Sequence, residues 1–162
     1  MGEEGKGMNA AYNVTEQVGH LLRRVYQRHL AIFQENAFDP SMTSVQFMTL
    51  CVLRDRGPSS QSELVRATAI DQGTIRGIIE RLTARGLISL ARDEQDGRKV
   101  IMALTPEADA LLDNMVPSAQ TISELTMGSL NPAERVALIY LLKRLLDEPD
   151  EQKSDAKELE DD

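Results

Sequence analysis

A short segment near the middle of the chain combines amide, hydroxyl and guanidinium side chains with two glycines four residues apart. Glutamine can pair with adenine, and arginine can pair with guanine, on the floor of a DNA major groove. Glycine inside a helix costs about 1 kcal/mol relative to alanine, and close approach of the backbone to a groove is one reason to keep it. The candidate groove-contacting residues are Gln72, Gly73, Thr74, Arg76 and Gly77. The competing interpretation is structural: Gly73 falls in a first helical turn, where propensity matters little, and Gly77 is merely tolerated.

A second cluster of charged residues surrounds a turn-rich segment, residues 93–97. Arg92 precedes the turn, and Arg98 and Lys99 follow it. An arginine at the tip of a β-hairpin can enter the minor groove, where the electrostatic potential is most negative. We expect Asp96 to hold the Arg98 guanidinium through a charge-assisted hydrogen bond. An ordinary charged surface hairpin has the same composition, so the pattern alone leaves both interpretations open.

Helical periodicity places the first cluster on the outer face of a helix that Asp71 caps and Gly86 ends. Four apolar residues recur at helical spacing and form one stripe that should face the core, namely Ile75, Ile78, Ile79 and Leu82. Gly73 and Gly77 lie opposite that stripe, and Arg76 lies at its flank. The helix is therefore predicted to show a small, polar face to the outside.

The neighbouring segments predict a helix-turn-helix followed by a hairpin. Capping boxes at Thr43 and Ser60 open two helices, which extend to about Arg56 and Thr68. Short β-type runs flank the turn-rich segment, at residues 87–92 and 99–104. We expect a mainly α fold with a small β-hairpin wing (class α+β). The winged helix-turn-helix should span residues 43–104, and flanking helices should span residues 11–36 and 105–147.

Length and composition favour a single small domain over residues 11–147 of the 162-residue chain. The hydrophobic share of 41% is enough for a core, and the aromatic share of 4% favours helices packed on helices. One cysteine excludes an intrachain disulfide, and no Cys/His spacing fits zinc, so we expect neither a metal site nor another cofactor. The chain has no signal core and no apolar run of bilayer length, which predicts a soluble, cytoplasmic protein without a membrane partner.

The net charge of −8 argues against DNA binding until its distribution is considered. Residues 147–162 hold nine acidic residues and two lysines, a net charge of −7, so the other 146 residues carry only −1. Residues 54–99 carry nine basic and seven acidic residues, a net charge of +2. We expect disordered tails at residues 1–10 and 148–162. A tail that competes with DNA for the basic surface is the functional alternative to a solvated end.

Residues 43–105 resemble the winged-helix core of the multiple-antibiotic-resistance regulator (MarR) family. Residues 71–86 match the recognition helix of that family, and residues 92–98 match its wing. The resemblance implies a homodimer on a pseudo-palindromic operator of double-stranded DNA. Its two recognition helices would lie in successive major grooves and its wings in minor grooves. The flanking helices would form the dimer interface, and they are also too apolar to stand exposed in water.

The expected DNA-contacting set has two further positions, and the resemblance has one departure. Ser60 and Gln61, at the start of the preceding helix, complete the expected contact set. Many family members have Ser or Thr where this chain has Arg76, and Arg where it has Gly77. The base contacts of other members therefore cannot be transferred to this chain, and its operator sequence stays open.

The family resemblance also implies a small aromatic acid as effector, bound between the dimer helices and the DNA-binding part. The expected ligand residues are His20, Arg23 and Tyr26 on the first helix, with Met48 and Cys51 on the second. Arginine offers a two-pronged donor to a carboxylate. The chain further resembles the repressors of nicotinate pathways, whose effector is a hydroxylated pyridine carboxylate. The alternative is that these side chains are solvated or belong to a dimer interface.

The expected function is thus that of a repressor that a ligand releases from DNA. Three alternatives stay open. A winged helix can serve as a protein-interaction module that does not read DNA. The chain can also be a constitutive regulator, or a redox-sensing one that uses Cys51. That thiol lies in an apolar stretch, where burial raises the thiol pKa and makes it unreactive. The sequence has no nucleophile elbow, phosphate loop or metal spacing, so we expect no enzyme activity.

Overall fold

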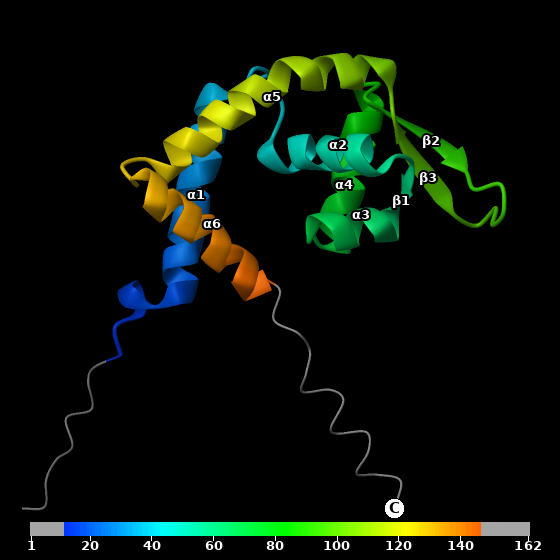
Figure 1. Ribbon diagram of the computed structural model, residues 1–162. Helices are drawn as coiled ribbons and strands as arrows, with labels where there is room; N and C mark the ends of the chain where they lie inside the picture. The colour runs from blue at the N-terminus through cyan, green and yellow to red at the C-terminus, as the bar shows by residue number, and fades with distance from the viewer. Residues whose placement is uncertain (1–11, 147–162) are drawn as a thin grey trace, which may run out of the picture. The chain divides into compact units, whose positions relative to one another are not determined.

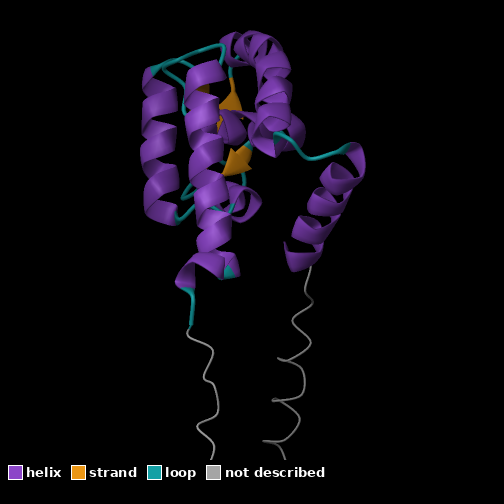
Figure 2. Cartoon of the chain, turned by 90° about the vertical axis from the view of Figure 1, so that its left-hand side faces the viewer, coloured by secondary structure: helices purple, strands orange, loops and turns teal. Residues whose placement is uncertain are grey.

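The computed structural model describes residues 12–146. The elements are a short 3-10 helix η1 (Val14–Glu16), helices α1 (Val18–Asn36) and α2 (Ser44–Arg56), strand β1 (Ser59–Ser60), helices α3 (Gln61–Thr68) and α4 (Gln72–Ala84), strands β2 (Ile88–Arg92) and β3 (Val100–Leu104), and helices α5 (Pro106–Met127) and α6 (Pro132–Leu146) (Figure 1). Helices dominate (Figure 2). The strands form one small sheet. The expected mainly helical fold with a β wing is confirmed.

The chain divides into two compact units, one ending at Thr126 and the other beginning at Met127. The single domain expected over residues 11–147 stays a prediction. The expected tails, residues 1–10 and 148–162, lie outside the described residues. No helix in the described range 12–146 combines the length and the apolar character that a membrane crossing requires.

The first helix begins later than its apolar pattern predicts. Asn13 accepts hydrogen bonds from the amide and the hydroxyl of Thr15, at 3.1 and 2.7 Å, and so closes the turn of η1. Gln17 is then extended, with φ −75° and ψ 139°, and α1 starts only at Val18. The helix expected from residue 11 was therefore wrong in its first turns, because a local side-chain bond outweighs periodicity there.

The helix starts around the helix-turn-helix follow the predicted capping residues. Thr43 and Gln46 exchange hydrogen bonds as a capping box, and the residues that open α3, Ser60 and Glu63, do the same. The Asp71 carboxylate accepts the amide of Thr74 at 2.9 Å and so caps α4. These bonds satisfy amides that a helix N-terminus otherwise leaves without partners. Gly86 follows α4 with φ 71°, as its predicted terminal position requires.

The sheet has three strands, where the sequence predicted two. Its order is β1-β3-β2, and both pairs are antiparallel. Ile88 lies opposite Leu104, and Arg92 lies opposite Val100. The additional strand is β1, where Ser59 pairs with Met102. Two serines carry no alternation pattern, so no strand signal was present in the sequence.

One hydrophobic core lies in the first unit, between α1, α2, α3, α4, α5 and the sheet. All four residues of the predicted stripe on α4 are buried. Their neighbours in the core come from every surrounding element: Phe33, Met42, Leu50, Leu53, Leu64, Leu87, Ile88, Met102, Ala108, Leu112, Met115 and Ile122. Because this stripe is buried, the rotation of α4 about its axis is set, and the opposite side of the helix faces outward.

Within the described residues, the second unit contains the last residue of α5, the whole loop after it and the helix α6. Asn131 and Glu134 form a further capping box, with bonds of 2.8 and 3.0 Å. The Arg135 guanidinium donates to the carbonyls of Leu130 and Gly128, at 2.8 and 3.0 Å. These contacts fix the loop that precedes α6.

Candidate nucleic-acid interface

The predicted reading face of α4 is exposed. Gln72, Gly73, Thr74 and Arg76 are all exposed, and Gly77 is half-buried. The capping carboxylate of Asp71 accepts hydrogen bonds from the side chain and the amide of Thr74, and these bonds lower its pKa. A negative charge at this position also interacts favourably with the positive end of the helix dipole. The start of α4 is therefore held in place before any contact with DNA.

Neither glycine of α4 is required by the fold of the chain itself. A Cβ on Gly77 would lie 3.5 Å from Nη1 of Arg81, which is ordinary van der Waals contact. A Cβ on Gly73 would lie 3.4 Å from Oδ1 of Asp71. Neither residue has a positive φ. Space for a side chain is present at both positions, so packing within the chain does not explain why glycine stands there.

A groove of about 620 Å³ runs between α4, the start of α3 and the wing. Its floor is apolar, with Ile79, Leu90 and Met102 among the lining residues. Six of the predicted DNA-contacting residues line it: Ser60, Gln61, Gln72, Arg76, Arg98 and Lys99. The structure thus brings together, on one surface, residues that lie as far apart in sequence as positions 60 and 99.

Two contacts organise the groove. The Arg76 guanidinium bonds Glu80 one turn later, at 3.2 Å between Nε and Oε1, and both side chains are largely exposed. The Gln61 amide donates to the carbonyl of Gln72 at 3.4 Å and so connects α3 with α4. An exposed ion pair of this kind is worth little in stability. Arg76 can therefore leave Glu80 for a phosphate or a base at small cost.

The wing tip differs from its prediction in one contact. Asp96 does not hold the Arg98 guanidinium: its Oδ1 accepts the backbone amide of Arg98, at 3.1 Å. The carboxylate is turned toward its own loop, as Asp commonly is in tight turns. In the described part of the chain, the guanidinium of Arg98 makes no ion pair with Asp96.

The residue that organises the wing loop is Asp93, which the sequence analysis did not single out. Its Oδ1 accepts the amides of Gln95 and Asp96, each at 2.8 Å. These bonds lower the pKa of Asp93. The Asp-rich turn composition was the available signal. Arg92 lies at the base of the loop and lines a separate hollow with Asp93 and Ile101, outside the groove.

A second cavity lies between α1, α2 and α5 in the first unit, with a volume of about 280 Å³. Its lining is largely aromatic and aliphatic, with a few hydroxyls and one imidazole: Tyr26, His29, Phe33, Ser44, Phe47, Met48, Ala119, Ile122 and Ser123. The Phe33 and Phe47 rings are tilted, with centroids 5.9 Å apart. A cavity with this lining suits a flat, weakly polar ring.

Two of the five predicted ligand residues line this cavity, Tyr26 and Met48. His20 and Arg23 lie one to two turns closer to the N-terminus of α1 and do not reach it. Cys51 is half-buried and packs against the core instead. Burial raises the pKa of its thiol, as the apolar stretch predicted.

His29 is a cavity residue that the predicted ligand set omitted. Its Nδ1 lies 2.9 Å from the Thr126 hydroxyl, and that hydroxyl donates to the carbonyl of Ile122, at 2.8 Å. Because a hydroxyl has one proton, Nδ1 must be the donor to Thr126. In the neutral ring, Nε2 is then an acceptor. The signal in the sequence was its place three residues after Tyr26, on the same helix face.

Among the described residues, no group of His, Cys, Asp and Glu side chains is arranged to hold a metal ion.

Comparisons with known proteins agree with this architecture. The family model for the MarR family matches residues 41–99, which contain α2, α3, α4 and most of the wing. The HTH-type transcriptional repressor NicR of Pseudomonas putida is 64% identical to this chain over 139 residues. That alignment covers 86% of this chain and 88% of the repressor.

Two solved structures are similar in fold. One is BpsR of Bordetella bronchiseptica, whose DNA binding is regulated by 6-hydroxynicotinic acid: the TM-score is 0.80 at 54% identity, over 85% of this chain and 99% of that chain. The other is a mutant MarR of E. coli complexed with operator DNA, with a TM-score of 0.75 at 24% identity, over 83% and 99%. The second likeness concerns the fold alone. An identity of 64% across most of both chains leaves one assignment: this chain belongs to the MarR family.

Proposed function

We propose that this chain is a homodimeric transcriptional repressor that binds double-stranded DNA at a specific operator and is released by a hydroxylated nicotinate. The observation that carries the proposal is the groove between α4 and the wing. It presents Gln72, Arg76 and Arg98 on one surface, from elements that burial and capping fix in place. The similarity to a repressor over most of the chain supports the same role.

In this proposal, α4 enters a major groove and the wing enters the adjacent minor groove. Gln72, Thr74 and Arg76 contact base edges or phosphates, and Gly73 and Gly77 allow the helix backbone to come close. The wing supplies the basic residues that contact the minor groove and the backbone, namely Arg92, Arg98 and Lys99. Asp96 acts through the loop, by holding the amide of Arg98.

The proposed dimer explains apolar surface that each unit leaves exposed. On α1, the exposed residues include Val18, Leu21, Leu22 and Val25. On α6 they include Val136, Ile139, Tyr140, Leu141, Leu145 and Leu146. Exposed apolar patches of this extent mark protein interfaces. A second copy of the chain is the occupant that a two-fold operator requires.

The proposed effector site is the cavity between α1, α2 and α5. A hydroxylated nicotinate is a single flat ring, which the apolar lining, Phe33 and Phe47 included, can contact. With Nδ1 as the donor to Thr126, Nε2 of a neutral His29 ring can accept a hydrogen bond from the ring N–H or hydroxyl of the ligand. Ser44 can supply a hydroxyl donor for its carboxylate. The Ser123 hydroxyl donates to the carbonyl of Ala119 at 3.0 Å and would have to leave it to do the same. An effector acts only if it binds the DNA-free geometry more tightly than the DNA-bound one.

The test uses a duplex selected from a random pool by the full-length protein. Fluorescence anisotropy at several salt concentrations measures its Kd, with and without 6-hydroxynicotinic acid. We expect a steep loss of affinity with salt, through release of counterions, and a rise in Kd with the acid. Nicotinic acid, which lacks the hydroxyl, is the matched control ligand. If the pool yields no preferred duplex and the protein does not retard DNA, the chain is a protein-interaction module instead.

The remaining parts of the proposal follow from this role. The chain acts on the DNA of the cytoplasm and performs no catalytic step. Cys51 has no redox role, because its thiol is half-buried with a raised pKa. Treatment with peroxide that changes the operator Kd would contradict this last point.

A further inference from the structure

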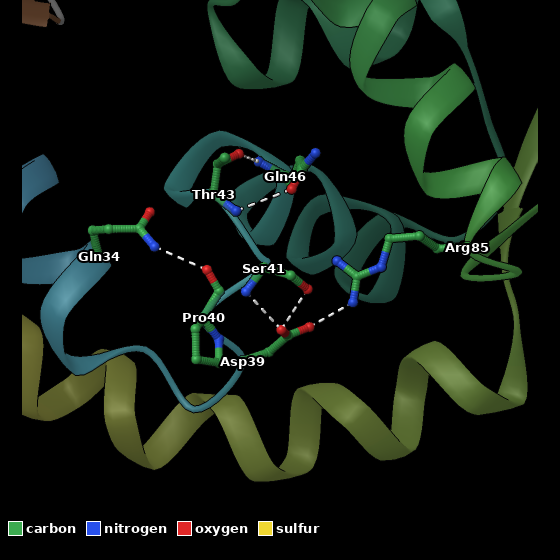
Figure 3. A network of polar contacts seen from close by, with 7 residues as sticks. All are labelled: Gln34, Asp39, Pro40, Ser41, Thr43, Gln46 and Arg85. Carbon is green, nitrogen blue, oxygen red and sulfur yellow. Dashed lines mark hydrogen bonds and ion pairs between the residues drawn. The ribbon is translucent and has the colours of Figure 1, made fainter.

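The seven-residue connection between α1 and α2, residues 37–43, is joined to the recognition helix by an ion pair. The Asp39 carboxylate accepts a hydrogen bond from Nη2 of Arg85, 46 residues later in the sequence (Figure 3). The Asp39 side chain is 17% exposed and the Arg85 side chain is 33% exposed. A pair shielded to this degree is screened less by salt than a surface pair. It is therefore a candidate for a contact with a defined role.

Asp39 is held in one orientation by its own turn. Its Oδ1 accepts the amide and the hydroxyl of Ser41, at 2.9 and 2.6 Å, while Oδ2 faces Arg85 (Figure 3). Burial raises the pKa of the carboxyl, but the bonds from Ser41 and Arg85 lower it by more, so the net shift is downward. The carboxylate is thus ionised and fixed at the point where Arg85 arrives.

Both ends of the connection lie next to the proposed effector cavity. At the α1 end, Gln34 donates to the carbonyl of Pro40 at 2.8 Å, and its neighbour Phe33 lines the cavity. At the α2 end, Thr43 forms the capping box with Gln46, and its neighbour Ser44 lines the cavity. A displacement of either helix around a ligand therefore moves the connection directly.

The other partner, Arg85, is the C-terminal cap residue of α4. Its amide donates to the carbonyl of Arg81 at 3.1 Å, so its backbone continues the helix. Because a helix moves as a rigid element, a force applied at Arg85 reorients the outer face of α4 at its other end. That other end is the N-terminus of α4, where Gln72 lines the groove, 13 residues before Arg85.

We propose that Asp39 is a positioning residue that couples the effector cavity to the recognition helix through Arg85. This inference rests on the proposed function. It adds the route by which occupation of the cavity by a hydroxylated nicotinate changes the orientation of α4. The coupling is a chain of fixed contacts, from the cavity-lining ends of α1 and α2, through the turn at Asp39, to the end of α4.

The test compares Asp39→Asn with the unmodified protein in the full-length chain. Asparagine keeps an oxygen for the Ser41 turn and removes the charge that binds Arg85. Anisotropy gives the factor by which saturating 6-hydroxynicotinic acid raises the Kd for the selected duplex. We expect that factor to fall by about five-fold, within the range of couplings between sites in proteins. Calorimetric titration of the DNA-free protein with the acid should give an unchanged Kd, because Asp39 does not line the cavity.

Two further variants separate coupling from general damage. Arg85→Gln removes the same bond from the exposed end of α4, and it keeps the test valid if Asp39→Asn fails to fold. It should lower the coupling factor by the same amount, and the double variant should lower it no further. Asp113→Asn is the matched control, because it breaks the 3.2 Å bond from Arg54 between α2 and α5, away from α4. It should leave the coupling factor unchanged.

Each outcome decides something. Variants that respond to the acid as strongly as the unmodified protein overturn the inference and leave the proposed function intact. Variants whose acid binding weakens in parallel with the response show a damaged cavity, and they also overturn it. An unmodified protein that binds the duplex but ignores the acid overturns both the effector part of the proposed function and this inference.

Discussion

Replacing Gly77 by alanine should change stability and DNA binding in opposite directions. The added Cβ would lie 3.5, 3.6 and 3.8 Å from atoms of the flexible Arg81 guanidinium, all ordinary contacts. The folded chain therefore accepts the methyl group without rearrangement. Alanine in a helix interior is favoured over glycine by about 1 kcal/mol, partly because it restricts the unfolded chain. We expect the free energy of unfolding of Gly77→Ala to rise by up to about 1 kcal/mol, or about 3 °C in Tm at fixed protein concentration.

DNA binding should suffer from the same methyl group. If the α4 backbone at Gly77 approaches the wall of a major groove, a side chain there must displace the helix or lose contacts. A defect equivalent to one mismatched base pair costs about 1–3 kcal/mol, which is roughly a 5- to 150-fold rise in Kd. Anisotropy with the selected duplex at one fixed salt concentration measures this change. Thermal unfolding followed by circular dichroism on the same sample measures stability.

The control is Asp113→Asn on α5, which lies outside the groove and outside the exposed apolar residues of α1 and α6 that the proposed dimer would cover. It should leave the Kd for DNA unchanged. If Gly77→Ala binds the duplex as tightly as the unmodified protein, the glycine is merely tolerated and the close-approach argument fails. If the variant is less stable than the parent, the space that the structure shows beside Arg81 is not available, and the stability argument fails instead.

Four further outcomes follow from the described contacts. Arg98→Ala should weaken DNA binding by about 1–3 kcal/mol, measured by anisotropy at fixed salt; an unchanged Kd contradicts the wing assignment. His29→Phe should abolish the calorimetric signal of 6-hydroxynicotinic acid while leaving the Kd for DNA within about two-fold, and retained acid binding would exclude the imidazole from the site. The stability that Asp39 contributes should be complete above its unfolded pKa of 3.8 and should be lost as pH falls through its lower folded pKa. Acid unfolding curves of the parent and Asp39→Asn should thus converge at low pH, and parallel curves would contradict the ion pair. Treatment with peroxide should leave DNA binding unchanged, because Cys51 is half-buried with a raised pKa.

Local signals in the sequence predicted the elements that position the groove. The capping pairs that begin with Thr43 and Ser60 fixed the starts of α2 and α3 within one residue, because a cap is decided by side chains three residues apart. The stripe that begins with Ile75 fixed which face of α4 is buried. Six residues of the predicted contact set accordingly lie along one groove.

Features that depend on distant partners escaped prediction. Strand β1 forms because Ser59 pairs with Met102, and two consecutive serines give no sequence signal for that pairing. The ion pair of Asp39 and Arg85 joins positions 46 residues apart, and neither residue has a distinctive neighbour pattern. The cavity lining was predicted only in part for the same reason: the family resemblance pointed to Tyr26 on α1, but only packing against α5 selects His29 over Arg23. Asp96 shows that a local prediction also fails when a backbone amide and a side chain are alternative donors to one carboxylate.

The short strand β1 has a consequence for the operator. Ser60 pairs with Ile101 in the sheet and also caps α3, so one residue connects the wing directly to the helix-turn-helix. Within one proposed half-site, the protein then sets a fixed distance between the residues that contact the major groove and those that contact the minor groove. An insertion of a single base pair between those two contacts, a shift of about 3.4 Å along the axis, cannot be absorbed by the chain. Variation among natural binding sites is therefore expected between the half-sites, where two protomers can adjust, rather than inside them.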